Sequence, residues 1–509
     1  METKTAAIEM RNITKRFGPV LANDKVWLNI YRGEILALLG ENGSGKTTLM
    51  NMLSGIYFPD EGEIKIDGKE VVIRSPKDAF DNGIGMIHQH FKLVDVLTAA
   101  ENIVLGLPGK LDLKAASAKI REICDKYGFS VDPTQKIYDM SVSQKQTVEI
   151  VKVLYRGADI LILDEPPAVL TPQETDKLFA VLRNMRNDGK AIVIITHKMH
   201  EVEALSDRVA ILRHGQFIGD MLTKDTNAQE MTNMMVGHAV SLNIERPDPV
   251  DPKPRIEVKG LTVRSVDGII KLDDVSFTAN SGEILGIAGI SGCGQKELLE
   301  AIAGLQTVES GSISYIEDDG SREELIGKDP LSIAELGVSL SFVPEDRLGM
   351  GLVGNMNLAD NMMLRSFRRG KSIFTDRRSP RALAESVVQE LSVSTPSVDT
   401  PVRRLSGGNV QKVLVGREIA SAPTVLLTAY AVRGLDIHSS YTIYDLINRQ
   451  KKAGVAVIFV GEDLDVLLEL CDRILVLCGG KVSGIVPGRG AEKREVGMMM
   501  TKLGGQSHE

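Results

Sequence analysis

An octapeptide near the N-terminus, GENGSGKT at residues 40–47, has the residue types that bind a nucleoside triphosphate. It follows an apolar run and precedes a helical pattern, and its glycines let backbone N–H groups turn toward phosphate oxygens. We expect the Lys46 ammonium to reach the β- and γ-phosphates and the Thr47 hydroxyl to bind Mg²⁺. The residues predicted to contact the nucleotide here are Gly40, Glu41, Asn42, Gly43, Ser44, Gly45, Lys46, Thr47 and Thr48.

Two carboxylates end a second apolar run, LILDEP at residues 161–166. Asp164 would bind Mg²⁺, directly or through water, because such a strand ends beside the phosphate-binding loop. Glu165 would polarise the water that attacks the γ-phosphate. The alternative is a strand end whose carboxylates only form salt bridges. With the intact loop beside it, the pair predicts hydrolysis of a nucleoside triphosphate.

The chain contains two copies of one domain, since several segments recur in the same order. LSDRVAILRHGQ at 205–216, for example, matches LCDRILVLCGGK at 470–481. A charged, proline-dense segment lies between the copies and is typical of an extended linker. We therefore expect domains at 1–245 and 256–509, joined by a linker at 246–255.

Each copy is predicted to be α/β. In the first copy, three runs of Ile, Val and Leu are typical of strands buried on both faces of a parallel sheet, at 33–40, 158–166 and 191–198. The helix after the first loop is predicted to bury one face, formed by Leu49, Met52, Leu53 and Ile56. The stretch of roughly 100–157 is expected to be mostly helical.

Composition narrows the class of protein. With 509 residues, 43% hydrophobic and 25% charged, the chain is an ordinary globular protein too long for one core. A net charge of −8 and a pI near 5.7 argue against a nucleic-acid binder. No apolar run reaches the length of a membrane span, and charges throughout the N-terminus argue against a secretory signal. Cysteines 124, 293, 471 and 478 lack metal-ligand spacing and are expected to be free thiols in a reducing compartment.

The segment LSGGN at 405–409 adds the most specific signal. With the loop and LILDEP, it makes the chain resemble tandem ATP-binding cassette (ABC) proteins over nearly its whole length. The resemblance implies two P-loop nucleotide-binding domains, each with a RecA-like parallel core, an antiparallel β subdomain and a helical subdomain, and it implies ATP and Mg²⁺. It also implies that Ser406, Gly407 and Gly408 of the second domain meet the γ-phosphate of ATP held by the first.

Three further roles follow from this resemblance. Gln89 is similar to the glutamine that senses Mg²⁺ and links to the membrane partner, and His197 to the histidine beside the γ-phosphate. Phe17 is similar to the aromatic residue that stacks on adenine, although an ordinary core aromatic is the alternative. The predicted catalytic residues are thus Lys46, Gln89, Glu165 and His197, and the predicted Mg²⁺ ligands are Thr47, Gln89 and Asp164.

The second copy keeps the glycines of the loop, GISGCGQK at 289–296, but loses every reactive position. The replacements, first copy to second, are Lys46 to Gln295, Thr47 to Lys296, Gln89 to Glu345, Asp164 to Ala429, Glu165 to Tyr430, His197 to Glu462 and Phe17 to Val266. The signature of the first copy is degraded too, to MSVSQ at 140–144. We therefore predict one hydrolytic site per chain. The second loop is predicted to be structural, or to hold ATP that exchanges slowly.

The first copy also departs from the family pattern. Pro167 follows DEP where Thr or Ser is common, and Thr171 stands where the family usually has Asp. The second copy keeps that aspartate, Asp436. Because Asp436 would serve the competent site and Thr171 the degenerate one, the losses fit one intact composite site.

Among tandem cassettes, the short linker and the asymmetric loss resemble bacterial importers of sugars and nucleosides. HQHF and LTAAENIVLG within residues 85–106 are similar to the branch linked to basic-membrane-protein lipoproteins, which imports nucleosides. The alternatives are import of ribose or another simple sugar, or a soluble nucleotide-gated switch on the ribosome or DNA.

The interpretation as an importer implies that the partners are two integral membrane permease subunits and an extracytoplasmic solute-binding lipoprotein, and that nucleic acid is not a partner. It implies a peripheral position on the cytoplasmic face of the cell membrane. Permease contacts are expected around 89–102 and 345–361. Pairing of cassettes within one chain and between two chains are both compatible with the sequence.

Overall fold

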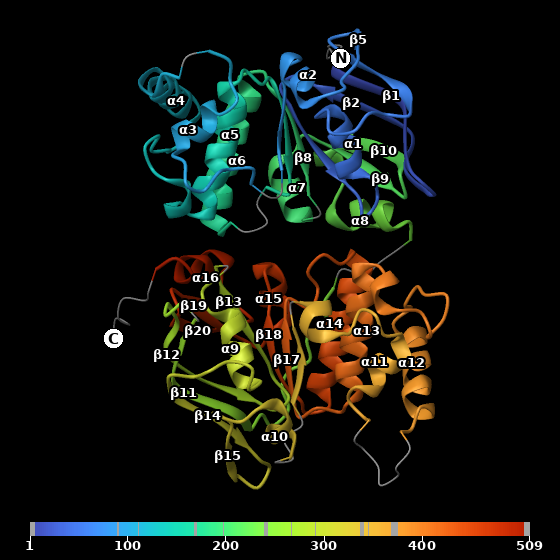
Figure 1. The fold of residues 1–509 in the computed structure, drawn as a ribbon, viewed down its shortest axis with the longest axis vertical. Coiled ribbons are helices and arrows are strands. Elements are labelled where there is room, and N and C mark those ends of the chain that lie inside the picture. The colour runs from blue at the N-terminus through green and yellow to red at the C-terminus, as the bar shows by residue number, and fades with distance from the viewer. Residues whose placement is uncertain are drawn as a thin grey trace. The chain divides into compact units, whose positions relative to one another are not determined.

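The computed structural model describes residues 6–88, 91–109, 111–166, 170–196, 198–238, 243–265, 267–290, 292–335, 340–344, 346–367 and 375–502. The chain divides into two compact units, Met1–Ser241 and Leu242–Glu509, called here the first and the second unit. Each unit contains two sheets and a set of helices (Figure 1). Gln89, Pro167, His197, Val266 and Glu345 lie outside the described residues.

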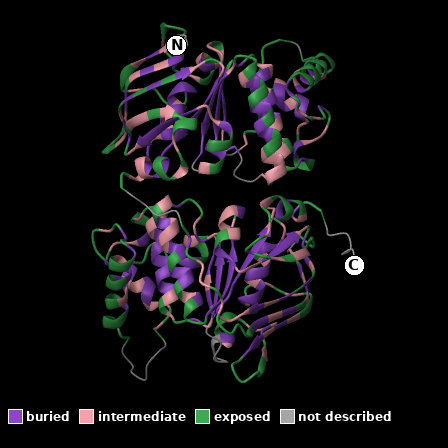
Figure 2. Cartoon of the chain, turned by 180° about the vertical axis from the view of Figure 1, so that it is seen from behind, coloured by how far each residue is buried: buried purple, intermediate pink, exposed green. Residues whose placement is uncertain are grey.

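The first unit is centred on a six-stranded sheet of order β10-β9-β3-β8-β7-β6, in which only β10 runs antiparallel to its neighbour. Its strands are β3 (Glu34–Leu39), β6 (Ile84–Ile87), β7 (Ile160–Asp164), β8 (Ala191–Ile195), β9 (Arg208–Arg213) and β10 (Gln216–Leu222). Every residue of β3, β7 and β8 is buried, as the three apolar runs predicted (Figure 2).

A second, antiparallel sheet of order β2-β1-β4-β5 packs with helix α1 on the core sheet. Its strands are β1 (Ala6–Phe17), β2 (Val20–Tyr31), β4 (Glu61–Ile66) and β5 (Lys69–Val71). The predicted helical stretch forms α3, η1, α4 and α5, which lie on the other side of the core sheet in Figure 1. The helices are α1 (Lys46–Leu53), α2 (Pro76–Asp81), α3 (Ala99–Val104), α4 (Leu113–Tyr127), η1 (Ile137–Asp139), α5 (Val142–Tyr155), α6 (Pro172–Asn187), α7 (Met199–Leu205), η2 (Thr223–Asp225) and α8 (Ala228–Val236).

The prediction for α1 is wrong at its C-terminal end. Leu49, Met52 and Leu53 are buried as expected, but Ile56 lies beyond the helix and is 46% exposed. Gly55 ends the helical path with a φ of 75°, and a Cβ there would lie 2.2 Å from the Ser75 carbonyl oxygen. The chain therefore turns away before Ile56 can reach the core.

The second unit repeats this architecture with sheets β16-β17-β18-β13-β19-β20 and β12-β11-β14-β15. Its strands are β11 (Pro254–Arg264), β12 (Ile270–Asn280), β13 (Ile284–Gly289), β14 (Ser310–Ile316), β15 (Arg322–Glu324), β16 (Leu340–Val343), β17 (Val425–Ala429), β18 (Ala456–Val460), β19 (Arg473–Cys478) and β20 (Lys481–Pro487). Its helices are α9 (Gln295–Ile302), α10 (Pro330–Glu335), the π-helical turn η3 (Arg347–Gly351), α11 (Leu358–Met363), α12 (Arg378–Glu390), η4 (Val402–Arg404), α13 (Gly407–Ala420), α14 (Ile437–Lys452), α15 (Leu464–Leu470) and α16 (Lys493–Met499).

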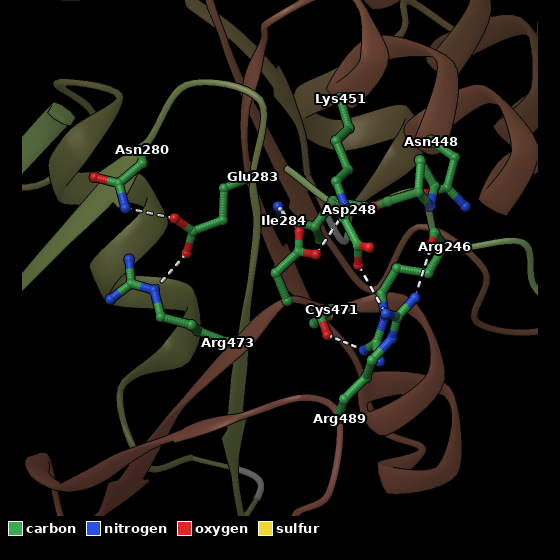
Figure 3. A network of polar contacts seen from close by, with 12 residues as sticks. Arg246, Asp248, Asn280, Glu283, Ile284, Asn448, Lys451, Cys471, Arg473 and Arg489 are labelled. Carbon is green, nitrogen blue, oxygen red and sulfur yellow. Dashed lines mark hydrogen bonds and ion pairs between the residues drawn. The ribbon is translucent and has the colours of Figure 1, made fainter. Parts of the chain in front are cut away.

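The proline-dense segment between the domains is fastened to the second unit. The Arg246 guanidinium donates to the backbone oxygens of Leu468 (2.9 Å) and Cys471 (Figure 3). Asn448 donates to the Glu245 carbonyl at 2.6 Å. Arg489 pairs with Asp248 at 2.7 Å. The first half of the segment thus follows the surface of the second unit, and its last two residues already belong to β11.

All four cysteines are free, as predicted. Cys124 and Cys471 are buried, and Cys293 and Cys478 are half-buried. Within the described ranges, no helix is both long and apolar enough to cross a membrane.

Candidate nucleotide-binding site

The first loop (residues 40–47) connects β3 to α1 and depends on its glycines. Gly45 caps the N-terminus of α1 with φ 95° and ψ 3°, a left-handed conformation that suits glycine. A Cβ at Gly45 would lie 2.3 Å from the Ala22 carbonyl oxygen. The strand, the tight turn and the helix therefore have the arrangement that the sequence predicted for a phosphate-binding loop.

The interior of the first loop contains buried polar groups that could donate hydrogen bonds to an anion. Lys46 is 7% exposed, and its Nζ donates to the backbone oxygens of Gly40 (2.7 Å) and Glu41 (2.9 Å). Burial lowers the pKa of Lys46. The Ser44 Oγ is buried without a hydrogen-bond partner among the described residues. An unsatisfied buried hydroxyl beside a buried ammonium fits a phosphate group, which would accept from both.

The predicted Mg²⁺ ligands Thr47 and Asp164 lie together. Asp164 is the last residue of β7, is 8% exposed, and its carboxylate is hydrogen-bonded to the Thr47 side chain. Burial, with a smaller effect of the Glu165 charge, raises the pKa of Asp164 to about 6. A buried carboxylate beside a hydroxyl at the end of the loop is the donor set that Mg²⁺ prefers, and the cation would relieve the cost of the buried charge.

Glu165 is held where β7 and β8 end. Its backbone N–H donates to the Ile195 oxygen at 2.9 Å, and its φ is 49°, an uncommon left-handed value for a residue other than glycine. Its charge acts on both Asp164 and Lys46. The structure thus brings four predicted residues, Lys46, Thr47, Asp164 and Glu165, to one loop.

Phe17 is not the core aromatic that was the alternative interpretation. It is 41% exposed at the end of β1. Its ring meets Tyr57 edge-on at 5.1 Å between centroids, and the Lys15 Nζ lies 5.6 Å from the ring centre. A half-exposed aromatic face remains available for a planar ligand, so stacking on adenine stays a prediction.

The second loop (residues 289–296) ends in the same helix cap and has a different interior. Gly294 caps α9 with φ 97° and ψ 3°. Gln295 is 3% exposed, and its Nε2 donates to the Ile290 oxygen at 3.1 Å. The amide therefore bonds to a carbonyl of its own loop, as Lys46 does in the first, but brings no positive charge. The Lys296 side chain is exposed, and its Nζ lies 3.7 Å from the Glu300 carboxylate.

The end of β17 carries no acid. Ala429 is buried, and Tyr430 has a φ of 53° and donates its N–H to the Val460 oxygen at 3.0 Å, the backbone geometry of Glu165. The Arg433 guanidinium lies 5.9 Å from the Tyr430 ring centre and 3.1 Å from the Glu462 carboxylate. A buried alanine and an aromatic ring thus stand where the first unit has Asp164 and Glu165.

The predicted signature residues begin helix α13. Ser406 is its N-cap, accepting from Asn409 N (3.4 Å) and Asn409 Nδ2 (2.9 Å), with Gly407 and Gly408 in the first turn. A Cβ at Gly408 would meet only side-chain atoms, no nearer than 3.6 Å. The N-terminus of a helix with glycines in its first turn suits an anion. Its contact with ATP bound to the first loop stays a prediction.

Thr171 and Asp436 occupy equivalent places. Each is an N-cap, Thr171 of α6 and Asp436 of α14. Asp436 accepts from Ser439 N at 2.7 Å. Both residues therefore have a capping role, in addition to the role that the family resemblance implies for Asp436.

Sequence reasoning missed Asn23, which lies under the first loop. Asn23 is fully buried, and its Nδ2 donates to the Gly45 oxygen at 3.3 Å. In the second unit Leu272 occupies this place, since a Cβ on Gly294 would lie 2.5 Å from its Cδ2, as one on Gly45 would lie 2.6 Å from Asn23 Nδ2. A buried amide in β2, where the second copy has leucine, was the available signal.

The sequence pattern of one family, ABC transporter, matches residues 23–168 and 272–428. The chain belongs to the ABC transporter family. Proteins of this family bind ATP with Mg²⁺ and hydrolyse it, so the chain is an ABC-type ATPase. The two matches correspond to the two predicted cassettes.

Three similar proteins extend over almost the full length. The nucleoside import ATP-binding protein NupA of Lactococcus lactis is 42% identical, with 99% of each chain covered. The glucose import ATP-binding protein TsgD13 of Haloferax volcanii is 39% identical, over 98% of this chain and 96% of TsgD13. The guanosine import ATP-binding protein NupO of Bacillus subtilis is 40% identical, over 97% of both chains.

A solved structure shares the fold. It is the archaeal ribosome recycling factor aABCE1 in complex with the stalk protein aP1, with a TM-score of 0.59 and 16% identity over 91% of this chain and 87% of that chain. At this identity the likeness concerns the fold of the ABC ATPase and not its biological partner.

Proposed function

We propose that this chain is the ATP-hydrolysing subunit of a bacterial importer of nucleosides. The observation that carries the proposal is the full-length similarity to NupA and NupO, whose names record nucleoside and guanosine import. The first loop supports it, because four of the residues predicted for ATP hydrolysis, Lys46, Thr47, Asp164 and Glu165, interact there.

Hydrolysis takes place at the first loop in this proposal. Mg²⁺ on Thr47 and Asp164, with Gln89, would supply positive charge beside the β- and γ-phosphates. Lys46 and the backbone N–H groups of the loop hold those phosphates, and Glu165 takes up the proton of the water that attacks γ-phosphorus. The bond to the bridging oxygen breaks, which leaves ADP and phosphate. By resemblance to the family, His197 would act beside the γ-phosphate and Phe17 would stack on adenine.

The second unit contributes Ser406, Gly407 and Gly408 to this site, from the same chain or from another. ATP binding closes two cassettes, hydrolysis reopens them, and the change of shape drives the permease. The second loop, with Gln295 and Lys296 in place of Lys46 and Thr47 and no acid at the end of β17, adds structure to the closed pair and little or no hydrolysis.

A groove in the first unit offers a place for the permease. It has a volume of about 280 Å³ and lies between the end of α1, α2, β6 and α5. Its lining combines apolar residues, basic residues and one acid, and includes Ile56, Phe80, His88, Lys92, Leu105, Glu149, Lys152 and Arg156. The exposure of Ile56 is explained if a permease segment covers it. Two permease subunits and a solute-binding lipoprotein would complete the transporter on the cytoplasmic face of the membrane.

Sugar import is the second candidate, favoured by the 39% identity to the glucose import protein TsgD13. Nothing in the nucleotide site contacts the transported solute, so the two candidates differ only in their membrane partners. Both require the same chemistry at Glu165.

The test is uptake of labelled uridine and labelled ribose by cells that carry the whole transporter operon. Three chains are compared, the native one, Glu165→Gln, and Tyr430→Phe as the matched control in the second unit. Uridine uptake lost in Glu165→Gln and retained in Tyr430→Phe is the expected result. Ribose uptake with the same pattern would replace nucleosides by sugars. Uptake of both solutes unaffected by Glu165→Gln would overturn the importer proposal.

A further inference from the structure

The second unit contains a π-helical turn, η3 at Arg347–Gly351, that has no counterpart in the corresponding described stretch of the first unit, residues 91–98. Both stretches lead to the same anchor. Asn102 accepts from Val94 N at 2.7 Å, and Asn361 accepts from Val353 N at 2.8 Å. The turn therefore lies just before an anchor that both units share, and π-helical turns are frequent at functional sites.

Arg347, the first residue of this turn, links the start of helix α13 to the loop before Asp436. The proposed function places both segments at the nucleotide. Its Nη1 donates to the Gly407 oxygen at 3.1 Å, in the signature, and its Nη2 donates to the Arg433 oxygen, in the loop before Asp436. Both acceptors are neutral backbone carbonyls. A planar guanidinium with fixed donors holds two such carbonyls at a defined separation, which lysine cannot do.

The other end of the turn is fixed to the same helix. Arg417, on α13, donates to the Gly351 oxygen at 2.7 Å and pairs with the buried Glu418 at 2.8 Å. Gly351 packs so closely that a Cβ there would lie 2.8 Å from Leu414. The turn thus contacts α13 near both ends, at Gly407 and at Arg417.

The residues that replaced the catalytic ones support the same loop. Arg433, whose carbonyl accepts from Arg347, pairs with Glu462 at 3.1 Å and lies over the Tyr430 ring. Tyr430 and Glu462 stand where the first unit has Glu165 and His197. In the second unit, the residues that replace the predicted catalytic side chains thus form contacts that hold the loop leading to Asp436.

We infer that Arg347 is a positioning residue for ATP hydrolysis at the first loop. It holds the signature, Ser406–Gly408, and the loop before Asp436 at a fixed separation, so that both meet the nucleotide together. This inference rests on the proposed function, in which the signature of the second unit completes the first site. Loss of the two hydrogen bonds lets the signature and the Asp436 loop move independently, and pre-organised contacts of this kind act mainly on the transition state.

The test measures steady-state ATP hydrolysis by the assembled transporter with Arg347→Met, Arg347→Lys and a control, Arg381→Met. Arg381 is an exposed arginine of α12 that pairs with Asp399 at 2.8 Å. We expect Arg347→Met to lower kcat about tenfold with a small change in KM, a loss of about 1.4 kcal/mol in transition-state stabilisation. Arg347→Lys should lie between native and Arg347→Met, and Arg381→Met should be unchanged.

Two further measurements distinguish a failure of this inference from a failure of the proposed function and from misfolding of the variant. The melting temperature of Arg347→Met should match that of Arg381→Met. A loss in the free energy of unfolding as large as the loss in transition-state free energy would mean that Arg347 has only a structural role. Ser406→Arg tests the shared premise, since it should abolish hydrolysis. If Ser406→Arg retains activity, the composite site of the proposed function is wrong. If Ser406→Arg is inactive but Arg347→Met keeps kcat within about twofold, the positioning role of Arg347 is wrong.

Discussion

The two glycine loops of this chain end in the same helix cap and differ in the side chains that they enclose. The helix caps Gly45 and Gly294 have φ values of 95° and 97°. Around the first, Asn23, Ser44 and Lys46 bring buried polar groups. Around the second, the same places hold Leu272, Cys293 and Gln295.

This difference separates two uses of a glycine loop. The glycines are needed wherever the strand must turn sharply into the helix, because a Cβ at either cap would overlap a neighbouring backbone oxygen, that of Ala22 at 2.3 Å or Lys271 at 2.5 Å. The polar side chains are needed only where phosphate binds. We therefore propose that the second loop keeps its glycines for folding, or to hold ATP that exchanges slowly, without hydrolysing it.

The largest difference between the units should appear on mutating the paired residues Glu165 and Tyr430. Glu165→Gln removes the group that takes up the proton of the attacking water, so ATP turnover should fall at least about 100-fold. Tyr430→Phe, in the same backbone position, should leave turnover unchanged. Steady-state phosphate release by the assembled transporter measures both, and equal losses would contradict the assignment of hydrolysis to the first unit.

Asp164→Asn tests the buried carboxylate. The pKa of Asp164 is raised to about 6. Mg²⁺ binding needs the ionised form, so the apparent affinity for Mg²⁺ should weaken as the pH drops through about 6, and Asp164→Asn should be at least about tenfold slower near neutral pH. Turnover of the variant equal to that of the native chain would contradict this role.

The same substitution makes a stability prediction of opposite sign. Without Mg²⁺ and nucleotide, the ionised Asp164 is disfavoured in the folded chain above pH 6, because its folded pKa exceeds its unfolded one. Asp164→Asn should therefore melt at a higher temperature than the native chain at about pH 8. The gain should shrink as the pH falls below about 6 and disappear below about 4, where the carboxyl of Asp164 becomes protonated in both the folded and the unfolded state. Thermal melts across this range would contradict the burial argument if the gain were constant.

A smaller effect is expected from exchanging Asn23 and Leu272. Asn23→Leu removes the bond to the Gly45 oxygen, worth about 1 kcal/mol, and should raise the KM for ATP about fivefold with little change in kcat. Leu272→Asn should leave KM unchanged, since the second loop takes no part in turnover. A shift in KM of the same size in both variants would contradict the comparison.

Much of this architecture could be predicted from sequence because the signals are local. The strands β3, β7 and β8 are short apolar runs, and the first loop is a contiguous motif. Strand ends meet at the edge of a parallel sheet, which was enough to bring Asp164 and Glu165 to Thr47.

Other features depend on contacts between distant segments and left no local signal. Ile56 fits the helical period, but Gly55 must pass the Ser75 carbonyl and the helix ends first. Phe17 is exposed at the last position of β1, and the sequence pattern does not reveal where that strand ends. Arg347 reaches Gly407 and Arg433 across 60 and 86 residues. Such partners depend on tertiary packing.

The measurement that tests the central claim most directly is ATP turnover by the assembled transporter with Lys46→Ala and with Gln295→Ala. The account predicts that Lys46→Ala reduces turnover to the level of a sample without the chain, because the first loop is the hydrolytic one. Gln295→Ala should keep turnover close to native. Turnover of Lys46→Ala equal to that of the native chain, or a loss in Gln295→Ala as large as in Lys46→Ala, would contradict the claim that one loop hydrolyses ATP and the other does not.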